Sequence, residues 1–316
     1  MRLKSALRRG VAAAVIAGIV VSSGIPAYAG TWDIADGDIT VKAGDAEGTN
    51  RVTQGEKDVE DTDTVITGKS EENTVTIDTS GGDVDVTFDD LKIDVSGKKE
   101  GNGSDDSPVR ESNAAVTVQG DHDATIELDG KNELKSGSYN AGLEKNEHES
   151  EGTLTIKDDK GKDGSLTAEG GAGGGAGIGG GAEKTGSNIT IQGGTIEAEG
   201  GFGGAGIGGG IKSTGSNITI QSGAVKAVGG SNAAGIGDGA GVLSELDTDT
   251  PPSNPSNPNN IIICGDAEVT AKAGSQVADA KVPAIGGSYP ARRHGGGRLL
   301  FQPGHHPVVG FCFGHY

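Results

Sequence analysis

Apolar and polar residues alternate in short runs over most of this chain, and glycines separate the runs. In Asn217-Ile-Thr-Ile220 the two isoleucines fall on one side and the polar residues on the other. Alternation with a period of two residues predicts β-strands that bury one face. No window shows the 3.6-residue period of an amphipathic helix, and glycine throughout the chain disfavours helices. The pattern therefore predicts an all-β protein.

These runs recur with a fixed period of 29 residues. The stretch Ala176-Gly-Ile-Gly-Gly-Gly181 returns at 205–210 and, with one change, at 234–239. A period of this length is typical of solenoids, because one unit cannot bury its apolar face without its neighbours. Each unit holds three short strand-like runs. The sequence therefore predicts a single-stranded, right-handed parallel β-helix of about seven coils.

If each unit is one coil, equivalent residues stack about 4.8 Å apart and form internal ladders. Three ladders are predicted: Ile178, Ile207, Ile236 and Ile285; Ile189, Ile218 and Ile261; and Ile191, Ile220 and Ile263. Glycines such as those of 179–181 and 208–210 are expected to adopt positive φ and to let coils approach closely. A dinucleotide-binding loop at 173–181 is disfavoured, because the run leads into another strand and not into a helix.

The same pattern extends towards the N-terminus in degenerate form. Strand-like runs occur at 75–77, 84–88, 91–95, 115–118, 125–128, 133–134, 153–156 and 165–168. The alternation changes phase at Asp89-Asp90, which predicts a bend in the strand. Two segments interrupt the pattern: a polar loop at 98–106, and an insertion at 247–260 that contains four prolines among Ser and Asn.

Three regions follow from these patterns. Residues 1–29 are predicted to be a signal peptide, with Arg2 to Arg9 as the basic region, an apolar run at 11–21 and a small-residue site at Ala27-Tyr-Ala29. The apolar run is too short to span a membrane, which takes about 20 residues. Residues 30–290 form the predicted β-helix domain. The protein is therefore expected to be secreted, with no membrane span after cleavage of the signal.

The tail, residues 291–316, has a different composition: it contains no Asp or Glu, but four of the six histidines. We expect that it does not continue the coil. It is a disordered segment, a cap over the open end in which Leu299 to Phe301 cover the edge, or the product of a reading-frame change. The spacing of its histidines matches no metal-ligand motif.

Charge narrows the range of partners. The formal net charge of −19 becomes −23 when residues 1–29 are removed, because that segment carries four basic and no acidic residues. Phosphate would be repelled, so nucleic acid is not an expected partner. Two cysteines, Cys264 and Cys312, are too few for a disulfide framework. Hydrogen bonds and ladders of Ile, Val, Leu and Ala must hold the fold together.

The Trp32-Asp-Ile34 opening, Ile66-Thr-Gly68, Asn140-Ala-Gly-Leu143 and the Ala-Gly-Ile-Gly-Gly-Gly repeats resemble a family of bacterial carbohydrate-binding domains. The resemblance covers about residues 32–287. It implies a pectate-lyase-like right-handed parallel β-helix, found on exported or cell-surface proteins, mainly of Gram-positive bacteria. It also implies binding of acidic plant polysaccharide with calcium. The shared motifs are structural glycines and ladder positions, so the resemblance assigns no binding residue.

Carboxylates are the candidate ligands for calcium, a cation that prefers hard oxygen donors. The best cluster is Asp121 and Asp123 in one turn, with Asp89 and Asp90 expected one coil earlier. Solvated acidic turns are the alternative reading. The Gly-Gly-x-Gly-x-Asp calcium repeat is not matched, since only one repeat carries Asp238. No catalytic residues are assigned: Ser187 and Ser216 have no paired histidine, and basic partners for the carboxylates are few in the regular repeats.

Three functions remain open from the sequence. The first is non-catalytic binding of an extracellular polysaccharide or cell-wall glycan, acidic and bridged by calcium. The second is a structural surface stalk or adhesin whose sides bind no small ligand. The third is a lyase that acts on uronate polysaccharides.

Overall fold

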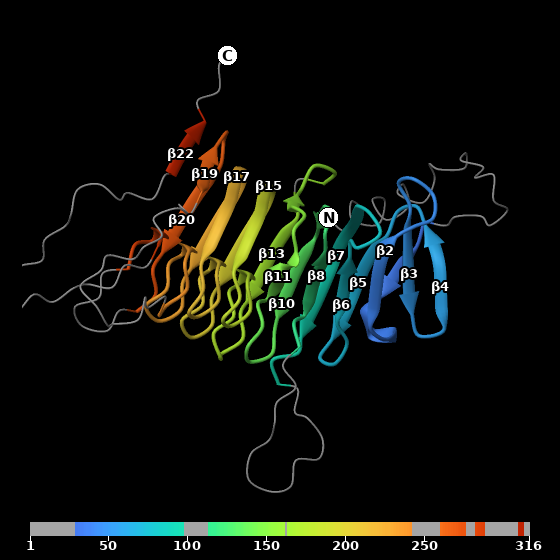
Figure 1. Cartoon of the computed structure of the whole chain (residues 1–316). Helices are drawn as coiled ribbons and strands as arrows, with labels where there is room; N and C mark the ends of the chain where they lie inside the picture. The colour runs from blue at the N-terminus through green and yellow to red at the C-terminus, as the bar shows by residue number, and fades with distance from the viewer. Residues whose placement is uncertain are drawn as a thin grey trace, which may run out of the picture.

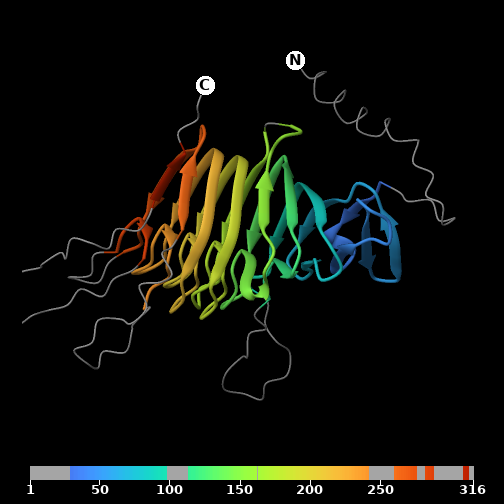
Figure 2. The same cartoon turned by 45° about the horizontal axis from the view of Figure 1, so that its top comes forward.

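The computed structural model describes residues 29–97, 113–161, 163–241, 260–275, 282–287 and the backbone of 309–312. These residues form an all-β structure whose strands are mostly parallel (Figure 1). One short 3-10 helix, η1, spans Ile34–Asp36. Figures 1 and 2 show the strands side by side along one axis, from β3 and β4 at one end to β20 and β22 at the other.

The strands form three parallel ladders, which the chain visits in turn. The first ladder contains β2 (Ile39–Ala43), β6 (Val75–Asp78), β8 (Val116–Gly120), β11 (Leu143–Ser150), β14 (Ile178–Gly179), β16 (Ile207–Gly208), β18 (Ile236–Gly237) and β21 (Ile285–Gly286). The second contains β7 (Val84–Asp94), β9 (Ala124–Asp129), β12 (Leu154–Lys157), β15 (Gly186–Glu199), β17 (Gly215–Val228), β19 (Ile261–Cys264) and β22 (Val309–Cys312).

The third ladder shares the long strands β7, β15 and β17, which bend and pair a second time. It adds β10 (Lys131–Lys135), β13 (Ser165–Glu169) and β20 (Glu268–Lys272). Two strands, β1 (Thr31–Asp33) and β5 (Val65–Ser70), precede β7 in the stack. The bend of β7 occurs at Asp90, whose φ is 52°, so the bend predicted from the change of phase is confirmed.

The registers confirm the predicted isoleucine ladders. Ile178 pairs with Ile207, Ile207 with Ile236, and Ile236 with Ile285. In the second ladder, the registers join Ile189 with Ile218 and Ile261, and Ile191 with Ile220 and Ile263. A spacing of 29 residues in the repeats thus corresponds to one step along the stack.

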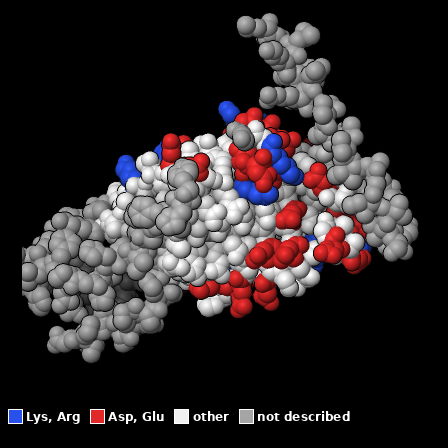
Figure 3. Space-filling model, turned by 90° about the horizontal axis from the view of Figure 1, so that it is seen from above, with Lys and Arg blue, Asp and Glu red and all other residues white. Residues whose placement is uncertain are grey.

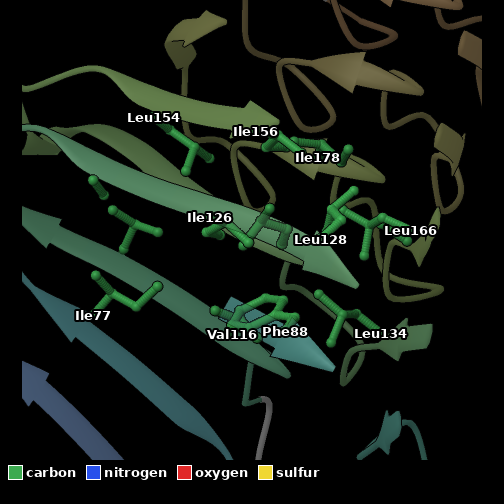
Figure 4. Close-up of a cluster of buried hydrophobic side chains, with 14 of the residues drawn as sticks. Ile77, Phe88, Val116, Ile126, Leu128, Leu134, Leu154, Ile156, Leu166 and Ile178 are labelled. Atoms are coloured by element: carbon green, nitrogen blue, oxygen red, sulfur yellow. The ribbon is translucent and has the colours of Figure 1, made fainter. Parts of the chain in front are cut away.

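Ladder side chains fill the space between the strands. Figure 4 shows Ile77, Phe88, Ile126 and their neighbours turned towards one another from different strands. Phe88, the largest of the fully buried side chains, is inaccessible to solvent. Alternation is visible in β7, where Val84, Val86 and Phe88 are buried and Asp85 is exposed. Burial of the apolar alternates, worth about 25 cal/mol per Å² of apolar surface, is what fixes one face of each strand inward.

Close approach of successive units requires glycine at one repeated position. Gly208 has φ +134°, and a Cβ atom there would lie 2.1 Å from the carbonyl oxygen of Gly237. Gly179 has φ +129° and the same 2.1 Å approach to Gly208. No other residue fits this geometry, because a side chain would clash with the backbone of the next unit. The expected close approach is confirmed, but the expected positive φ is found only at Gly179 and Gly208, since the other glycines of 179–181 and 208–210 do not have it.

An asparagine ladder accompanies the repeats and was not anticipated. Asn188 and Asn217 have φ of 55° and 51°, a region that asparagine tolerates better than most residues. Asn217 Nδ2 donates to Asn188 Oδ1 at 3.1 Å, and Asn260 Nδ2 lies 3.5 Å from Asn217 Oδ1. The stacked amides therefore join three successive units at the start of the second ladder.

The N-terminal end of the stack is antiparallel, which the repeat pattern did not indicate. Strands β3 (Asn50–Gln54) and β4 (Lys57–Asp61) add a meander to β2. Trp32 is buried beside it, and its Nε1 donates to Asp61 Oδ2 at 2.7 Å. Most of β4 is exposed and charged. Charged residues on an edge strand oppose pairing with other molecules, so this end of the stack is protected.

At the other end, one expectation is wrong. Val309–Cys312 of the tail forms β22, which pairs in parallel with β19. The tail therefore extends the second ladder by one strand, because β19 offers an edge of unpaired backbone groups and these four residues suit a strand. Leu299–Phe301, the loop 98–106, residues 1–28 and all but Asn260 of the insertion at 247–260 lie outside the described residues.

Candidate functional site

The structure separates the four carboxylates that were expected to share a calcium ion. Asp89 is in register with Asp129 at the end of β9, and Asp90 Oδ1 accepts from the Lys131 amide at 2.9 Å. Asp123 precedes β9 and donates its amide to Asp83 Oδ1 at 3.1 Å. The length of β9 therefore lies between the two pairs, roughly 20 Å at 3.3 Å per residue.

The same registers explain why the expected cluster does not form. Parallel strands align start with start, so the neighbour of Asp123 in the previous unit is Asp83 and not Asp89 or Asp90. Asp121 lies exposed in the bend before Asp123. His122 between them is engaged with Thr79, its Nδ1 lying 2.9 Å from the Thr79 carbonyl oxygen. In the part of the chain that the structure describes, no three His, Cys, Asp or Glu residues are grouped to hold a metal.

An open groove crosses the turns that connect the third ladder to the first. Its volume is about 420 Å³. Three successive units contribute to its lining: Glu169, Gly170 and Ala172 from one; Glu199, Gly200, Gly201 and Phe202 from the next; and Gly230 and Ser231 from the third. Because the rest of the lining is Gly, Ala and Ser, the side chains of Glu169, Glu199 and Phe202 determine what the groove can bind.

Two carboxylates stack along one side of the groove. Glu169 and Glu199 are in register on β13 and β15. Lys135 of the preceding unit pairs with Glu169 at 2.9 Å. Within the described residues no Lys or Arg is within ion-pair distance of Glu199, and its neighbour in the following unit is Val228. The groove therefore carries an uncompensated negative charge next to accessible acceptor oxygens.

Phe202 is the aromatic side chain of the groove, and it is 65 % exposed. It lies in the turn after β15, between Gly201 and Gly203, where the neighbouring units have the small residues Ala172 and Ser231. Tyr139, in the corresponding turn of an earlier unit, is 61 % exposed. A single exposed ring is ordinary on a protein surface, so what makes Phe202 a candidate contact is its place in a groove beside two carboxylates. The sequence signal was available: Phe202 interrupts a glycine run that both flanking repeats fill with small residues.

A second polar cluster lies inside the stack, on β11. Lys145 is fully buried and in register with Val118, at a position where the earlier units have an aliphatic residue. Its ammonium donates to the Ser150 carbonyl oxygen at 2.8 Å. Burial lowers the pKa of Lys145 from 10.5 to about 8, against the opposite influence of Glu147 and Asp123.

Glu144 and Asn146 join this cluster to the next unit. Burial raises the pKa of Glu144, whose carboxylate accepts from the Ala141 amide and from Asn146 Nδ2, both at 2.9 Å. Asn146 Oδ1 in turn accepts from the Gly181 amide at 2.9 Å. These buried bonds hold the irregular end of β11. They give the cluster a structural role, since Lys145 has no surface from which a ligand could reach it.

The distribution of charge shows where the carboxylates gather. Figure 3 shows Asp and Glu in several groups on the face seen from above, separated by a broad area of other residues.

Ser187 and Ser216 are in register on β15 and β17, and both are buried. Neither hydroxyl can therefore reach a substrate at the surface.

Comparison of the chain with protein-family profiles, curated proteins and solved structures finds no match. Among the residues described, no helix is both long and apolar enough to cross a membrane.

Proposed function

We propose that the chain forms a single-stranded, right-handed parallel β-helix of about seven coils, exported through the signal at residues 1–29. Two observations support the closed coil. The three ladders are visited in the same order in every unit, and one 29-residue step displaces all three registers by one level. The bends of β15 and β17 at Gly194 and Gly223, with φ of 80° and 92°, supply corners between the second and third ladders.

The proposed function is non-catalytic binding of an extracellular glycan. The observation that carries it is the exposed Phe202 in a groove beside the stacked carboxylates of Glu169 and Glu199. An aromatic ring offers a flat apolar face to a sugar ring, and carboxylates accept hydrogen bonds from hydroxyl groups. The resemblance to bacterial carbohydrate-binding domains favours the same class of ligand.

The sequence analysis led to a more specific proposal, in which the glycan is acidic and calcium bridges it to the protein. Calcium would have to neutralise carboxylates of the protein and of the ligand together. The alternative, a surface stalk without a small ligand, is favoured by the continuous ladders along one axis. A uronate lyase is the third reading.

A glycan array probed with residues 30–316, with and without EDTA, tests these readings. Binding to a glycan supports the proposal, and binding lost with EDTA supports the calcium-bridged form. Absence of binding across the array would contradict the proposal and leave the stalk. Release of unsaturated products that absorb in the ultraviolet would show the lyase.

A further inference from the structure

The groove around Phe202 contains negative but no positive side chains. Glu169 and Glu199 are the charged residues of its lining. The ion pair of Lys135 with Glu169 leaves Glu199 uncompensated among the described residues. A uronate chain would bring further carboxylates against these two, and like charges at short range repel. The carboxylates are also not grouped with a third that could hold a bridging cation.

A neutral, hydroxyl-rich ligand would not be repelled by the two carboxylates, and it would need no bridging cation. Hydrogen bonds from hydroxyl groups to an ionised carboxylate are shorter and stronger than those between neutral groups. Glu169 and Glu199 lie on adjacent strands about 4.8 Å apart, so they can accept from successive hydroxyls of one ligand. The exposed ring of Phe202 provides the apolar face. Together these features match a sugar ring, which has polar edges and apolar faces.

The direction of the groove indicates an extended ligand. Its lining comes from residues 169–172, 199–202 and 230–231, which belong to three successive units. A ligand in the groove therefore lies along the stack, across the strands, and spans about 10 Å from the first unit to the third. In the unit before these three, the corresponding turn carries the exposed Tyr139, so a second aromatic side chain stands at that end of the path. A chain several sugars long fits a path across three units better than a single terminal sugar.

We propose that this groove binds the interior of a neutral glycan chain, with one ring stacked on Phe202 and hydroxyls held by Glu169 and Glu199. This inference rests on the proposed glycan-binding function and specifies its ligand and its site.

Affinity electrophoresis provides the test. Residues 30–316 are run through native gels that contain xyloglucan, galactomannan or hydroxyethylcellulose, and through gels with polygalacturonate and calcium. We expect retardation by at least one neutral polysaccharide, unaffected by EDTA. Phe202→Ala should weaken binding at least about tenfold, as loss of a central aromatic contact does. Glu199→Gln, which removes the charge, should weaken it less.

Glu197→Gln is the matched control. Glu197 lies on the same strand, two residues away, and pairs with Lys226 at 3.5 Å outside the groove. Its substitution should leave retardation unchanged. Phe202 and Glu199 are exposed, so neither variant opens a cavity in the core.

The possible failures are distinguishable. Neutral binding that survives Phe202→Ala and Glu199→Gln would overturn the groove as the site and leave glycan binding intact. Retardation only by polygalacturonate, lost with EDTA, would overturn the neutral ligand but support the calcium-bridged form of the proposed function. If none of the polysaccharides retards the wild-type protein, both this inference and the proposed function lose their support.

Discussion

Gly208 lies where two successive units approach most closely. Its φ of +134° is unfavourable for residues with a side chain, and the Gly237 carbonyl oxygen occupies the space that a Cβ would need. At such a position the backbone conformation, and not burial, determines which amino acid can be present. Lys145 is the opposite case: its backbone is that of an ordinary strand, but its ammonium replaces an aliphatic side chain in the core.

Gly208→Ala should destabilise the protein by at least about 2 kcal/mol, because strain at positive φ and the clash with Gly237 add. Urea unfolding followed by circular dichroism measures the change. Gly97→Ala is the control, since a Cβ at Gly97 meets nothing within 4 Å and its φ is not positive. It should change the free energy of unfolding by less than about 0.5 kcal/mol. Equal effects of the two substitutions would contradict the close approach.

The stability of the wild type should rise with pH relative to Lys145→Met. The pKa of Lys145 is about 8 in the folded protein and 10.5 as the ordinary value, so between these values the unfolded chain binds more protons. Protons bound in excess by the unfolded state make stability increase with pH, by up to about 3 kcal/mol over this window. Below pH 8 the lysine is charged in both states, and its contribution no longer changes.

The measurement is a pair of urea unfolding series at pH 7, 8, 9 and 10. Other titrating groups are shared by the two proteins and cancel in the difference. We expect the advantage of Lys145→Met to be largest at pH 7 and to shrink above pH 8. If the free energies of unfolding of the two proteins change in parallel from pH 7 to pH 10, Lys145 keeps its proton in the folded state up to pH 10.

At the scale of elements, the two ends of the stack differ. The meander of β3 and β4 covers the N-terminal end with a charged edge strand. At the C-terminal end β22 pairs with β19, so four residues of the tail satisfy backbone groups that would otherwise form an open edge. An open edge of parallel strand is a template for pairing with another molecule.

Deletion of residues 309–316 should therefore lower the melting temperature and increase self-association. Light scattering coupled to size-exclusion chromatography measures the second effect. Deletion of residues 313–316 alone keeps β22 and should behave like the full-length protein. A monomeric, equally stable 309–316 deletion would show that the pairing of β22 with β19 contributes nothing to the edge.

At the scale of the whole molecule, stability depends on contacts between neighbouring units. In such stacks each unit contacts only the adjacent ones, and stability is close to a sum of unit and interface terms. Ile207 lies in the interior of its ladder, in register with Ile178 on one side and Ile236 on the other. A defect there affects two interfaces.

Ile207→Asp should abolish folding of the repeat region, because an unpaired buried carboxylate costs several kcal/mol. Loss of the β-type circular dichroism signal in native buffer would show it. Thr219→Asp, on the outward side of neighbouring β17, is the control and should remain folded. A folded Ile207→Asp protein with unchanged stability would contradict the inward ladder.

The sequence by itself determined the strands, their inward faces and the pairing of the repeats. A fixed period makes residue i meet residue i + 29, so Ile178, Ile207 and Ile236 could be placed without coordinates. The sequence also predicted the bend at Asp90, because the alternation of apolar and polar residues changes phase there. The antiparallel meander and β22 were missed, since neither belongs to the repeat.

Only the tertiary structure decided which polar residues meet. In the degenerate units no period fixes the register, so Asp123 faces Asp83 and not Asp90, and the expected cluster divides into two. The groove likewise joins Glu169, Glu199 and Phe202 from two units. Exposed acids look alike along a sequence. Their separation in space depends on loop lengths and strand registers, and these are set by the packing of the whole stack.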